Sequence, residues 1–342
     1  MKFSKVGIEA MAYALPQTIT TSHELEGELS PLYEKLNLQT GRLELMTGIR
    51  ERRFWPSGHL PSSASAEAGL KLLREGINPG EVDLLIHSAV CRDRLEPATA
   101  SYVHRTMGLG SSTQILDVSN ACLGFLNSLI LGASMIESGQ IKRAIITAGE
   151  NGKPLVEETI RRLNGEEHDR QSIKPYFANL TIGAAAVAWS IAHKDLLTAS
   201  SPSLGSYAIE TDTSHNQLCE GETAGDGLFM QTDSEELLHA GIAVAKNAWK
   251  KFTSRSEEWI LNPDLIVTHQ VGKAHTHAVL DALGLDHQKN FSTFEKLGNC
   301  GSASLPITYT MACEEDSAVL SSRSVLLGIG SGLSSLFLAL NP

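Results

Sequence analysis

The chain repeats one series of segments, and this internal repeat limits the fold more than any other feature of its 342 residues. The apolar run at 83–90 (DLLIHSAV) resembles the run at 264–271 (DLIVTHQV), and residues 183–191 resemble residues 332–340. Strand-like apolar runs alternate with helix-like segments, which is typical of layered α/β folds. The repeat therefore predicts an α/β protein made of two similar halves packed together.

The predicted joint between the halves lies near residues 200–206, which are rich in Ser, Pro and Gly. We expect an N-terminal half at 1–199 and a C-terminal half at 200–342, since a chain of this length suits two ordinary domains. Residues 150–180 of the first half are polar and irregular in pattern, with many charges. We therefore expect them to form a lid or insertion over the site.

A cysteine stands at a predicted strand-to-helix turn in the first half. Ile115–Val118 is a short apolar run typical of a buried strand, and apolar residues from Leu126 to Ile136 recur at helical spacing before Gly139. Cys122 would then lie in the first turn of a buried helix, where free amides and the helix dipole stabilise a thiolate. The position favours a nucleophile, although free cysteine is also among the most often buried residue types.

The second half offers polar partners at corresponding places. His269 directly follows the apolar run 265–268, where a parallel sheet presents residues at its carboxyl edge. Asn299 lies in the segment 298–304, the counterpart of the Cys122 segment. A Cys, a His and an Asn at strand ends can form a thiol-based acyl-transfer site. Alone, a buried His or a turn Asn is more often structural, so the conjunction with Cys122 carries the hypothesis.

Charge and cysteine usage exclude several classes of protein. The net charge of −11 argues against a general nucleic-acid surface. The cysteines are dispersed, which fits a reducing cytoplasm rather than a disulfide framework or a zinc ribbon. Residues 1–15 lack the features of a signal peptide, and the longest plain apolar stretch, 184–189, is too short to span a membrane. The five cysteines are Cys91, Cys122, Cys219, Cys300 and Cys313.

Two motifs that suggest other ligands fail in their context. The glycine-rich run 328–332 precedes a strand-like segment rather than a helix, which argues against a dinucleotide loop. His275 and His277 are two residues apart and would point to different faces of a helix, with no third ligand nearby. We therefore expect neither a metal ion nor a nicotinamide cofactor.

Short runs spread over nearly the whole chain resemble one known family. They are TGIRER at 47–52, ACLGF at 121–125, HQ at 269–270, GN at 298–299 and GIGSGL at 328–333. On these runs the chain resembles the thiolase-superfamily condensing enzymes of the ketoacyl synthase III type. The resemblance implies a five-layered αβαβα fold, a homodimer, a CoA or acyl carrier protein thioester as substrate, and no cofactor.

The same resemblance implies roles for the candidate site residues. Cys122 would carry an acyl group as a thioester, with His269 and Asn299 beside it. These two side chains would donate hydrogen bonds to the thioester oxygen of a second substrate and stabilise its enolate. The backbone amides of Cys122 and Ser331 would form the oxyanion hole.

A narrower resemblance concerns the loop after the strand at 82–90. The RDRLEPATAS run at 92–101 and the SNAC run at 119–122 resemble the branch that condenses acyl-CoA in long-chain olefin biosynthesis. In that branch Glu96 would reach into the partner subunit's site and remove an α proton as a general base. Without the resemblance, Glu96 is an ordinary loop glutamate before a proline.

The contacts to CoA differ from those of the priming branch of the family. That branch commonly has an Arg and a Trp near the TGIR run to clamp the adenine, where this chain has Met46 and Arg42. It also has Asn and Arg after His-Gln, where this chain has the VGKA run at 271–274. The remaining candidates for phosphate contact are Arg50, Arg52, Arg53 and Lys273.

Three hypotheses for function remain. The first is Claisen condensation of two fatty acyl-CoA thioesters, without decarboxylation, to a β-ketoacyl product. The second is decarboxylative condensation of an acyl-CoA with a malonyl thioester on acyl carrier protein. The third is an acyl-thioester hydrolase or an acyl-binding protein, which the intact Cys-His-Asn set disfavours. A downstream pathway enzyme or an acyl carrier protein is a further candidate partner.

Overall fold

The computed structural model describes residues 2–224 and 227–342. Its central feature is a mixed sheet in the strand order β11-β12-β13-β8-β1-β7-β6-β4-β5. The strands of the first half are β1 (Val6–Ala14), β4 (Leu84–Ser88), β5 (Gln114–Val118), β6 (Arg143–Asn151) and β7 (Ala184–His193). Those of the second half are β8 (Ser203–Thr211), β11 (Leu265–Thr268), β12 (Ser324–Gly330) and β13 (Ser334–Asn341).

The two halves of this sheet have matching topology. In the first half β1 pairs antiparallel with β7, β7 antiparallel with β6, and β6 parallel with β4. In the second half β8, β13, β12 and β11 pair in the same order and with the same directions. The repeated sequences therefore occupy equivalent strands, β4 with β11 and β7 with β13. The boundary predicted at residues 199 and 200, between β7 and β8, stays a prediction.

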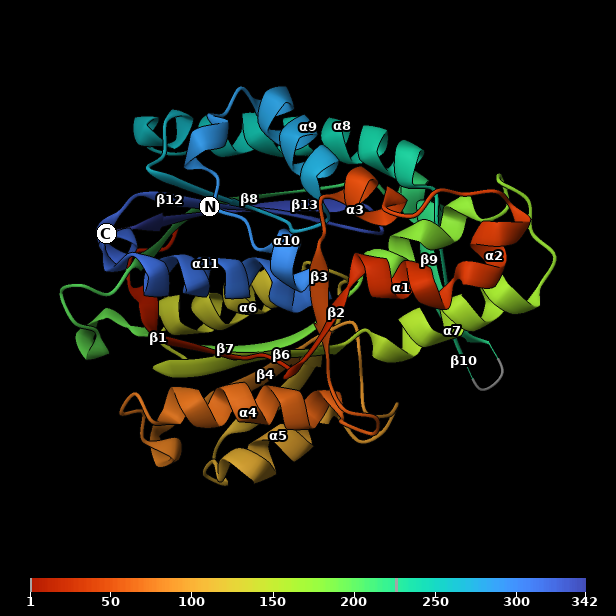
Figure 1. The fold of residues 1–342 in the computed structure, drawn as a ribbon. Helices are drawn as coiled ribbons and strands as arrows, with labels where there is room; N and C mark the ends of the chain where they lie inside the picture. Colours follow the sequence, from red (N-terminus) through yellow and green to blue (C-terminus); the bar gives the residue numbers. More distant parts are fainter. Residues whose placement is uncertain (1, 225–226) are drawn as a thin grey trace.

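Helices separate and cover the two halves of the sheet, so that five layers are stacked (Figure 1). The helices α6 (Gly124–Glu137) and α11 (Ser304–Glu315) lie in the middle layer, between the two sets of strands. The outer layers are α4 (Pro61–Leu73) with α5 (Thr99–Met107), and α8 (Ser234–Thr253) with α9 (Lys273–Leu283). The predicted αβαβα fold is confirmed.

The middle layer contains the main hydrophobic core. Helix α6 is apolar on nearly all its faces because strands and α11 surround it. Phe125 of α6 meets Trp189 of β7 edge to face, with ring centroids 5.4 Å apart. The Trp189 indole N–H donates to Thr310 Oγ1 of α11 at 2.9 Å. These contacts fix the helix that follows Cys122 against both halves of the molecule.

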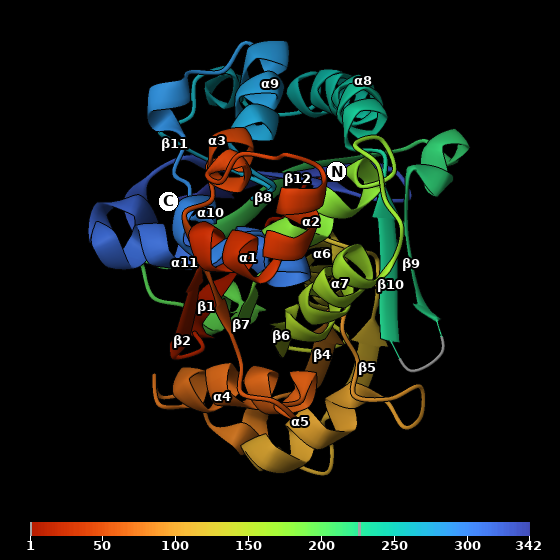
Figure 2. The ribbon, with the colours of Figure 1, turned by 45° about the vertical axis from the view of Figure 1, so that its right-hand side comes forward.

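Shorter elements surround one end of the layers, where α1, α2, α7 and the β9–β10 ribbon lie side by side (Figure 2). The helices are α1 (Ser22–Glu28), α2 (Ser30–Lys35), α3 (Arg42–Thr47), α7 (Lys153–Gly165) and α10 (Phe294–Leu297). The strand pairs are β2 (Thr18–Thr21) with β3 (Glu51–Phe54), and β9 (Cys219–Ala224) with β10 (Gly227–Thr232). The 3-10 helices are η1 (Pro79–Glu81), η2 (Lys174–Thr181), η3 (Lys194–Leu196), η4 (Thr213–Leu218), η5 (Glu258–Leu261), η6 (His287–Lys289), η7 (Gly301–Ala303) and η8 (Ser317–Ser321).

Residues 150–180 are more regular than the sequence pattern predicts. Helix α7 occupies much of this segment, and η2 follows it. The helical face is formed by Val156, Thr159, Ile160 and Leu163, which are buried at helical spacing. The expectation of an irregular segment is wrong. Many charged residues stand between these four buried residues, so their helical spacing is hard to recognise in the sequence.

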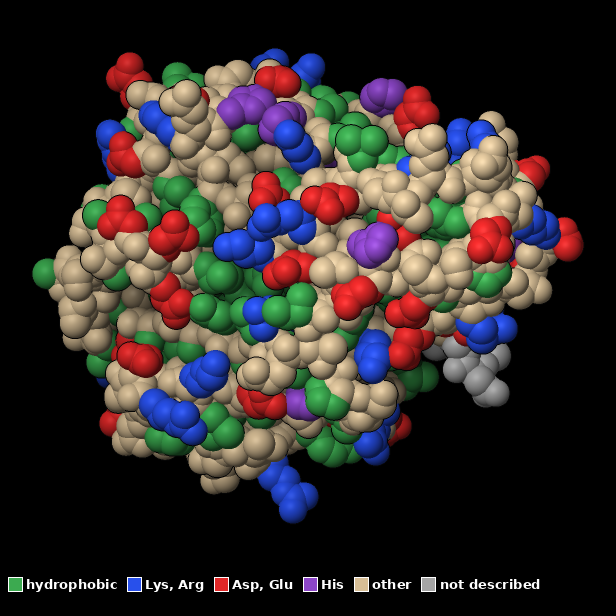
Figure 3. Space-filling model, viewed as in Figure 1, with side chains coloured by type: hydrophobic (Ala, Val, Ile, Leu, Met, Phe, Trp, Pro, Cys, Tyr) green, Lys and Arg blue, Asp and Glu red, His purple; other side chains and the backbone are tan. Residues whose placement is uncertain are grey.

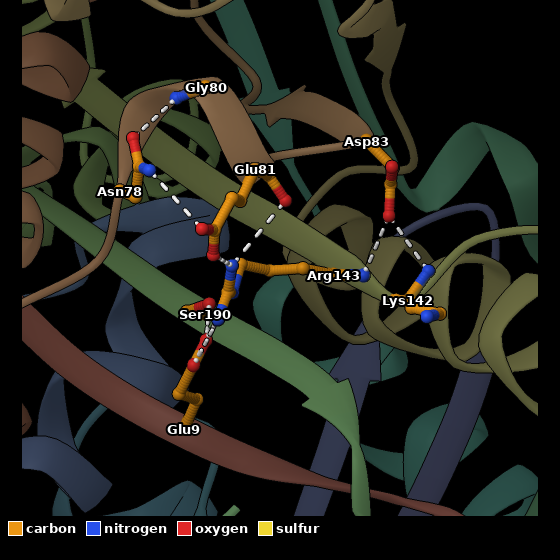
Figure 4. A network of polar contacts seen from close by, with 8 residues as sticks. All are labelled: Glu9, Asn78, Gly80, Glu81, Asp83, Lys142, Arg143 and Ser190. Carbon is orange, nitrogen blue, oxygen red and sulfur yellow. Dashed lines mark hydrogen bonds and ion pairs between the residues drawn. The ribbon is translucent and has the colours of Figure 1, made fainter. Parts of the chain in front are cut away.

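An ion-pair network centred on the buried Arg143 ties three strands together at the end of the sheet opposite the carboxyl ends of the parallel strands (Figure 4). Arg143 of β6 donates from Nε and Nη2 to the Glu9 carboxylate of β1, both at 2.8 Å. It also donates from Nη1 to Glu81 at 2.9 Å, and Ser190 of β7 donates to Glu9 at 2.8 Å. Glu9 stands at a bulge in β1, where the register against β7 shifts.

The surface carries charges of both signs in close alternation. On the face drawn in Figure 3, basic and acidic side chains are interspersed, and no broad area of that face is uniformly basic. This agrees with the net charge of −11. Among the residues that the structure describes, no helix has the length and apolar character that a bilayer crossing requires.

Candidate active site

One cavity of about 1050 Å³ collects side chains from both halves. Cys122 lines it from the first half, and His269, Asn299 and Ser331 line it from the second. The structure therefore brings together four of the predicted site residues. Part of the wall is apolar and comes from α7, β10 and α8, with Leu155, Leu228, Phe229, Leu237, Leu238 and Ile242.

Cys122 lies in a tight turn between β5 and α6. The backbone of Ala121 has φ +45°, and the amides of Leu123 and Gly124 donate back to Asn120 and Ala121. Such a conformation is costly for a residue with a side chain, and it is typical of turns at functional sites. Helix α6 begins only at Gly124. The expectation that Cys122 sits inside the first helical turn is therefore wrong by two residues.

The environment of Cys122 favours the neutral thiol. Burial and the nearby Glu150 carboxylate raise the pKa of Cys122 to about 12. The expected stabilisation of a thiolate by the helix is thus outweighed by the loss of solvent and by a like charge. Cys122 must consequently lose its proton at the moment of attack, and a neighbouring group must accept it.

His269 is a titratable base in the same cavity. It follows β11, it is buried, and its amide donates to Leu327 O at 3.0 Å. Burial, with a smaller effect from His275, lowers the pKa of His269 to about 4. The imidazole is therefore neutral near pH 7, with one nitrogen that can donate a hydrogen bond and one that can accept a proton.

Asn299 is held with its amide group fixed. Its Oδ1 accepts from the Gly301 N–H at 3.0 Å and from the Ser304 hydroxyl at 3.3 Å. Both bonds place the oxygen away from the cavity that Asn299 lines, so the Nδ2 group is left as the donor toward a bound molecule. Within the described chain no hydrogen bond engages Nδ2.

The glycine-rich loop after β12 packs directly on the cysteine turn. A Cβ added to Gly330 would stand 3.0 Å from Leu123 Cγ, and one added to Gly328 would stand 2.6 Å from Leu123 Cδ2. Ser331 follows Gly330 and lines the cavity with Cys122. The run 328–332 thus connects β12 to β13 beside the nucleophile turn, in agreement with its rejection as a dinucleotide loop.

Glu150 is a site residue that the sequence reasoning missed. It is the penultimate residue of β6, it is 3% exposed, and its carboxylate accepts from the amides of Val90, Cys91 and Ser302. A Cβ added to Gly301 would stand 2.8 Å from Glu150 Oε1, so the backbone of Gly301 packs closely on this carboxylate. The signal in the sequence is a charged residue two positions after the run 144–148, where burial demands a partner.

Glu96 lies outside the cavity of its own subunit. It stands in the loop between β4 and α5 and is exposed to solvent. Its neighbour Leu95 is 92% exposed, although Leu95 still borders the cavity. Within the described residues, the Glu96 carboxylate makes no hydrogen bond or ion pair. In this single chain Glu96 therefore does not meet Cys122.

Of the four basic candidates for CoA contact, one is excluded by the structure. Arg52 is fully buried and donates to Ser22 Oγ and Leu180 O, each at 3.0 Å, so its predicted role in phosphate contact is wrong. Arg53 donates to Pro16 O at 3.0 Å. Arg50 and Lys273 are exposed and lie close in space, because Gly48 packs against Lys273 Cβ. These two remain candidates, together with the partly buried Arg53.

The described residues contain no group of three His, Cys, Asp or Glu side chains arranged to hold a metal ion. His275 lines the cavity, whereas His277 packs against His287 with ring centroids 4.9 Å apart. The two histidines thus face different neighbours, as their spacing on α9 predicts.

Comparison with known proteins follows the same division into halves. Residues 116–195 match the family model of 3-oxoacyl-(acyl-carrier-protein) synthase III, and residues 262–341 match the model of its C-terminal part. The acyl-CoA:acyl-CoA alkyltransferase of Shewanella oneidensis is 36% identical over 99% of both chains. The enzyme of the same name from Xanthomonas campestris is 33% identical over 97% of both chains.

Solved structures agree with these relatives. The OleA of Xanthomonas campestris with a cysteine-to-alanine substitution superposes with a TM-score of 0.95 at 31% identity, over 100% of this chain and 98% of that one. The same enzyme with cerulenin bound also gives a TM-score of 0.95, at 32% identity. Fold and site together define a condensing acyltransferase of the thiolase superfamily. Within that class, the chain belongs to the acyl-CoA:acyl-CoA alkyltransferase family.

Proposed function

We propose that this enzyme joins two fatty acyl-CoA thioesters by a Claisen condensation without decarboxylation, through an acyl group carried on Cys122. One observation supports this most. A single large cavity holds a buried thiol, a neutral imidazole and a fixed amide from two halves of the chain, and it continues along an apolar wall. Its volume of about 1050 Å³ lies at the upper end of ligand pockets, which suits long acyl chains.

The first step transfers an acyl group from CoA to Cys122. The Cys122 sulfur attacks the thioester carbon, the bond to the CoA sulfur breaks, and CoA leaves as a thiol. The proton that Cys122 loses is the proton that CoA gains, and the neutral imidazole of His269 can carry it between the two sulfurs. The amides of Cys122 and Ser331 stabilise the oxyanion that forms on the way.

The second step forms the carbon–carbon bond. Glu96 of the partner subunit takes a proton from the α carbon of a second acyl-CoA, and the resulting enolate attacks the thioester carbon on Cys122. The bond to the Cys122 sulfur breaks, which releases a β-ketoacyl-CoA. The leaving sulfur takes up a proton and Glu96 gives up the proton that it removed, so both groups return to their starting state. His269 and Asn299 Nδ2 donate to the enolate oxygen, where negative charge develops.

Glu96 distinguishes this reaction from decarboxylative condensation. Loss of carbon dioxide generates a carbanion without a base, whereas an unactivated acyl-CoA must lose an α proton. Support for assigning the base to Glu96 comes from the solved variants of the Xanthomonas enzyme, which are altered at one cysteine, one histidine or one glutamate. The glutamate and the cysteine there stand 26 residues apart, the same separation as Glu96 and Cys122.

We propose a homodimer that forms through the edge of β5. In the described chain β5 pairs with β4 on one side, and its other edge has no strand beside it. An open edge strand invites pairing with another chain. Val90 and Leu95, in the segment that follows β4, are 52% and 92% exposed, and we expect a second copy to cover them. Such a dimer would carry Glu96 toward the neighbouring cavity.

Arg50 and Lys273 are proposed to meet the CoA phosphates, since both are exposed and adjacent. The absence of a cofactor and a cytoplasmic location stay predictions. A downstream enzyme or an acyl carrier protein as partner is likewise a prediction, and the lack of a broad basic area on the face in Figure 3 offers the acidic carrier no obvious docking surface there.

The experiment that tests the proposal uses subunits with complementary defects. Glu96→Gln should still be acylated at Cys122 by acyl-CoA, but should lose at least about 100-fold in condensation. Cys122→Ala should be inactive because it cannot be acylated. Mixed dimers of the two variants should regain one working site, made from Cys122 of one subunit and Glu96 of the other. Inactive mixed dimers, with subunit exchange demonstrated, would contradict the role of Glu96 across the interface.

A further inference from the structure

The segment that carries Glu96 is fixed at its first end by Glu150. The segment covers residues 89–98, between β4 and α5. At its start, the amide of Val90 donates to Glu150 Oε1 at 2.9 Å, and the amide of Cys91 donates to Glu150 Oε2 at 3.1 Å. Both carboxylate oxygens are thus used to hold two successive backbone groups, in a place where no solvent competes.

The other end of the segment is held by Asp117, which is exposed in this chain, unlike the buried Glu150. This residue lies on β5, and its Oδ2 accepts from the Thr99 amide at 2.7 Å while its Oδ1 accepts from the Ala100 amide at 2.8 Å. These amides open helix α5, so the carboxylate also compensates unpaired N–H groups and the positive helix end.

Between the two anchored ends, the Glu96 side chain makes no hydrogen bond or ion pair in the described chain. The middle of the segment is tied to other elements by two neighbours of Glu96. Asp93 Oδ1 accepts from the Ser62 amide at 2.9 Å, and the Arg94 guanidinium lies 5.0 Å from the centroid of the Tyr102 ring in α5. The direction in which Glu96 extends is therefore set by the backbone on either side of it. That backbone is fixed where Glu150 and Asp117 hold it.

We propose that Glu150 and Asp117 are positioning residues that hold the segment 89–98 so that Glu96 reaches the neighbouring subunit's cavity at the correct place. This inference rests on the proposed function of Glu96. A general base must lie within hydrogen-bond reach of the proton that it removes. A displacement of about 1 Å at such a group costs about 100-fold in rate.

The chemistry of a carboxylate suits this task, and an amide does not. Each carboxylate accepts two backbone N–H groups on its two oxygens, whereas Gln or Asn offers one acceptor and turns an NH₂ group toward the other N–H. Glu150→Gln and Asp117→Asn keep the side-chain size and remove one anchor each. Both variants should loosen one end of the segment.

Glu150 accepts a further hydrogen bond, and Asp117 has no counterpart of it among the described residues. This difference distinguishes an effect on the segment 89–98 from an effect on the loop of Asn299. The Ser302 amide donates to Glu150 Oε1 at 2.9 Å, which links the Glu96 segment to the loop of Asn299. A change at Glu150 can therefore act on its own subunit's Asn299 as well as on the partner's site. Within the described chain Asp117 makes no bond to that loop. Because Asp117 lies on β5, where we propose that the dimer forms, association of the mixed dimer is verified for each Asp117→Asn combination.

The test uses mixed dimers with one working site. One subunit carries Glu96→Gln and supplies Cys122, and the other carries Cys122→Ala and supplies Glu96. Differently tagged subunits allow the mixed dimer to be isolated. Asp117→Asn is then added to the subunit that supplies Glu96, or to the one that supplies Cys122. Glu150→Gln is added in the same two ways, and condensation and acylation are measured separately.

We expect Asp117→Asn to slow condensation about 100-fold when it is in the subunit that supplies Glu96. In the subunit that supplies Cys122 it should change the rate less than about twofold, and acylation should be normal in both arrangements. Glu150→Gln should slow condensation in either arrangement. A variant that merely destabilises the fold would affect both arrangements of Asp117→Asn alike, so the asymmetry identifies positioning.

Asp83→Asn is the matched control. Asp83 Oδ2 accepts from the amides of Lys142 and Arg143 at 2.8 and 3.0 Å, at the amino end of the parallel strands (Figure 4). The Asp83→Asn change should leave condensation unchanged in both arrangements.

An inactive parent mixed dimer would refute the proposed function of Glu96. An active parent with equal rates for Asp117→Asn in the two arrangements would overturn the positioning role alone, and Asp117 decides the matter even if Glu150→Gln does not fold.

Discussion

Gly330 packs against Leu123 so closely that a Cβ on Gly330 would stand 3.0 Å from Leu123 Cγ and 3.5 Å from the Leu123 amide nitrogen. The two residues belong to different halves of the chain, one beside Ser331 and the other beside Cys122. Their contact sets the distance between the two amides that we assign to the oxyanion hole. The fold therefore builds this part of the site by pressing one half against the other.

Gly330→Ala should consequently separate the two amides. We expect acylation to slow by about 100-fold, the scale on which one oxyanion donor contributes, with the fold retained. The acylation burst of free CoA from acyl-CoA is the measurement. Gly27→Ala in α1 is the control because a Cβ there meets nothing within 4 Å. A normal burst in Gly330→Ala would show that this contact does not position the amides.

The Cys122 thiol should react slowly with iodoacetamide at neutral pH. Its pKa is raised to about 12, so the reactive thiolate is scarce near pH 7 and increases as the pH rises toward that value. An unperturbed cysteine, with a pKa of about 8.5, reacts far more readily in the same range. Peptide mapping of alkylation against pH, with free glutathione as reference, measures this. Alkylation of Cys122 as fast as that of glutathione at pH 7 would contradict the raised pKa.

His269→Ala and Asn299→Ala should separate the two chemical steps. Each removes one donor to the enolate, so condensation should slow by about 100- to 1,000-fold while Cys122 still becomes acylated. Because the pKa of His269 is about 4, protonation of this residue should produce no change in wild-type condensation between about pH 6 and 8. Intact-protein mass and product analysis follow the two steps. Condensation at the wild-type rate in both variants would show that these donors are not used.

Arg52→Ala should destabilise the protein rather than weaken CoA binding. It removes the buried donor of Ser22 Oγ and Leu180 O, and an unsatisfied buried group costs about 1–3 kcal/mol. Denaturant unfolding should show this loss, whereas Arg50→Ala should unfold like wild type because Arg50 is exposed. A raised KM for acyl-CoA with unchanged stability in Arg52→Ala would reverse the structural role assigned here.

The fold could be predicted from the sequence because the patterns of its strands and helices are local and occur in both halves. The strands in the runs 83–90 and 264–271 are largely apolar, as is typical of strands covered on both faces. The cavity residues Cys122 and His269 were found for a related reason, since they follow β5 and β11, whereas Asn299 follows the short helix α10 rather than the predicted strand end. Such positions depend on element order, which sequence patterns report well.

What the sequence could not supply depends on contacts between distant segments. The raised pKa of Cys122 comes from burial and from Glu150, which the chain brings near only when β6 and the cysteine turn are both in place. Arg52 resembles its exposed neighbour Arg50 in the sequence, and only β2, β3 and η2 together reveal that it is buried. Helix α7 was not predicted because its buried face consists of only four residues.

The most direct test of the central claim is the product that the purified wild-type enzyme makes from one long-chain acyl-CoA in the absence of any malonyl thioester. The α-deuterated acyl-CoA is supplied alone, and the products are identified by mass spectrometry. We predict a β-ketoacyl product that contains two complete acyl chains, together with free CoA, and slower condensation than with the unlabelled substrate because an α C–D bond must break. Product that appears only after malonyl thioester is added, one acyl chain extended by two carbons, would contradict it.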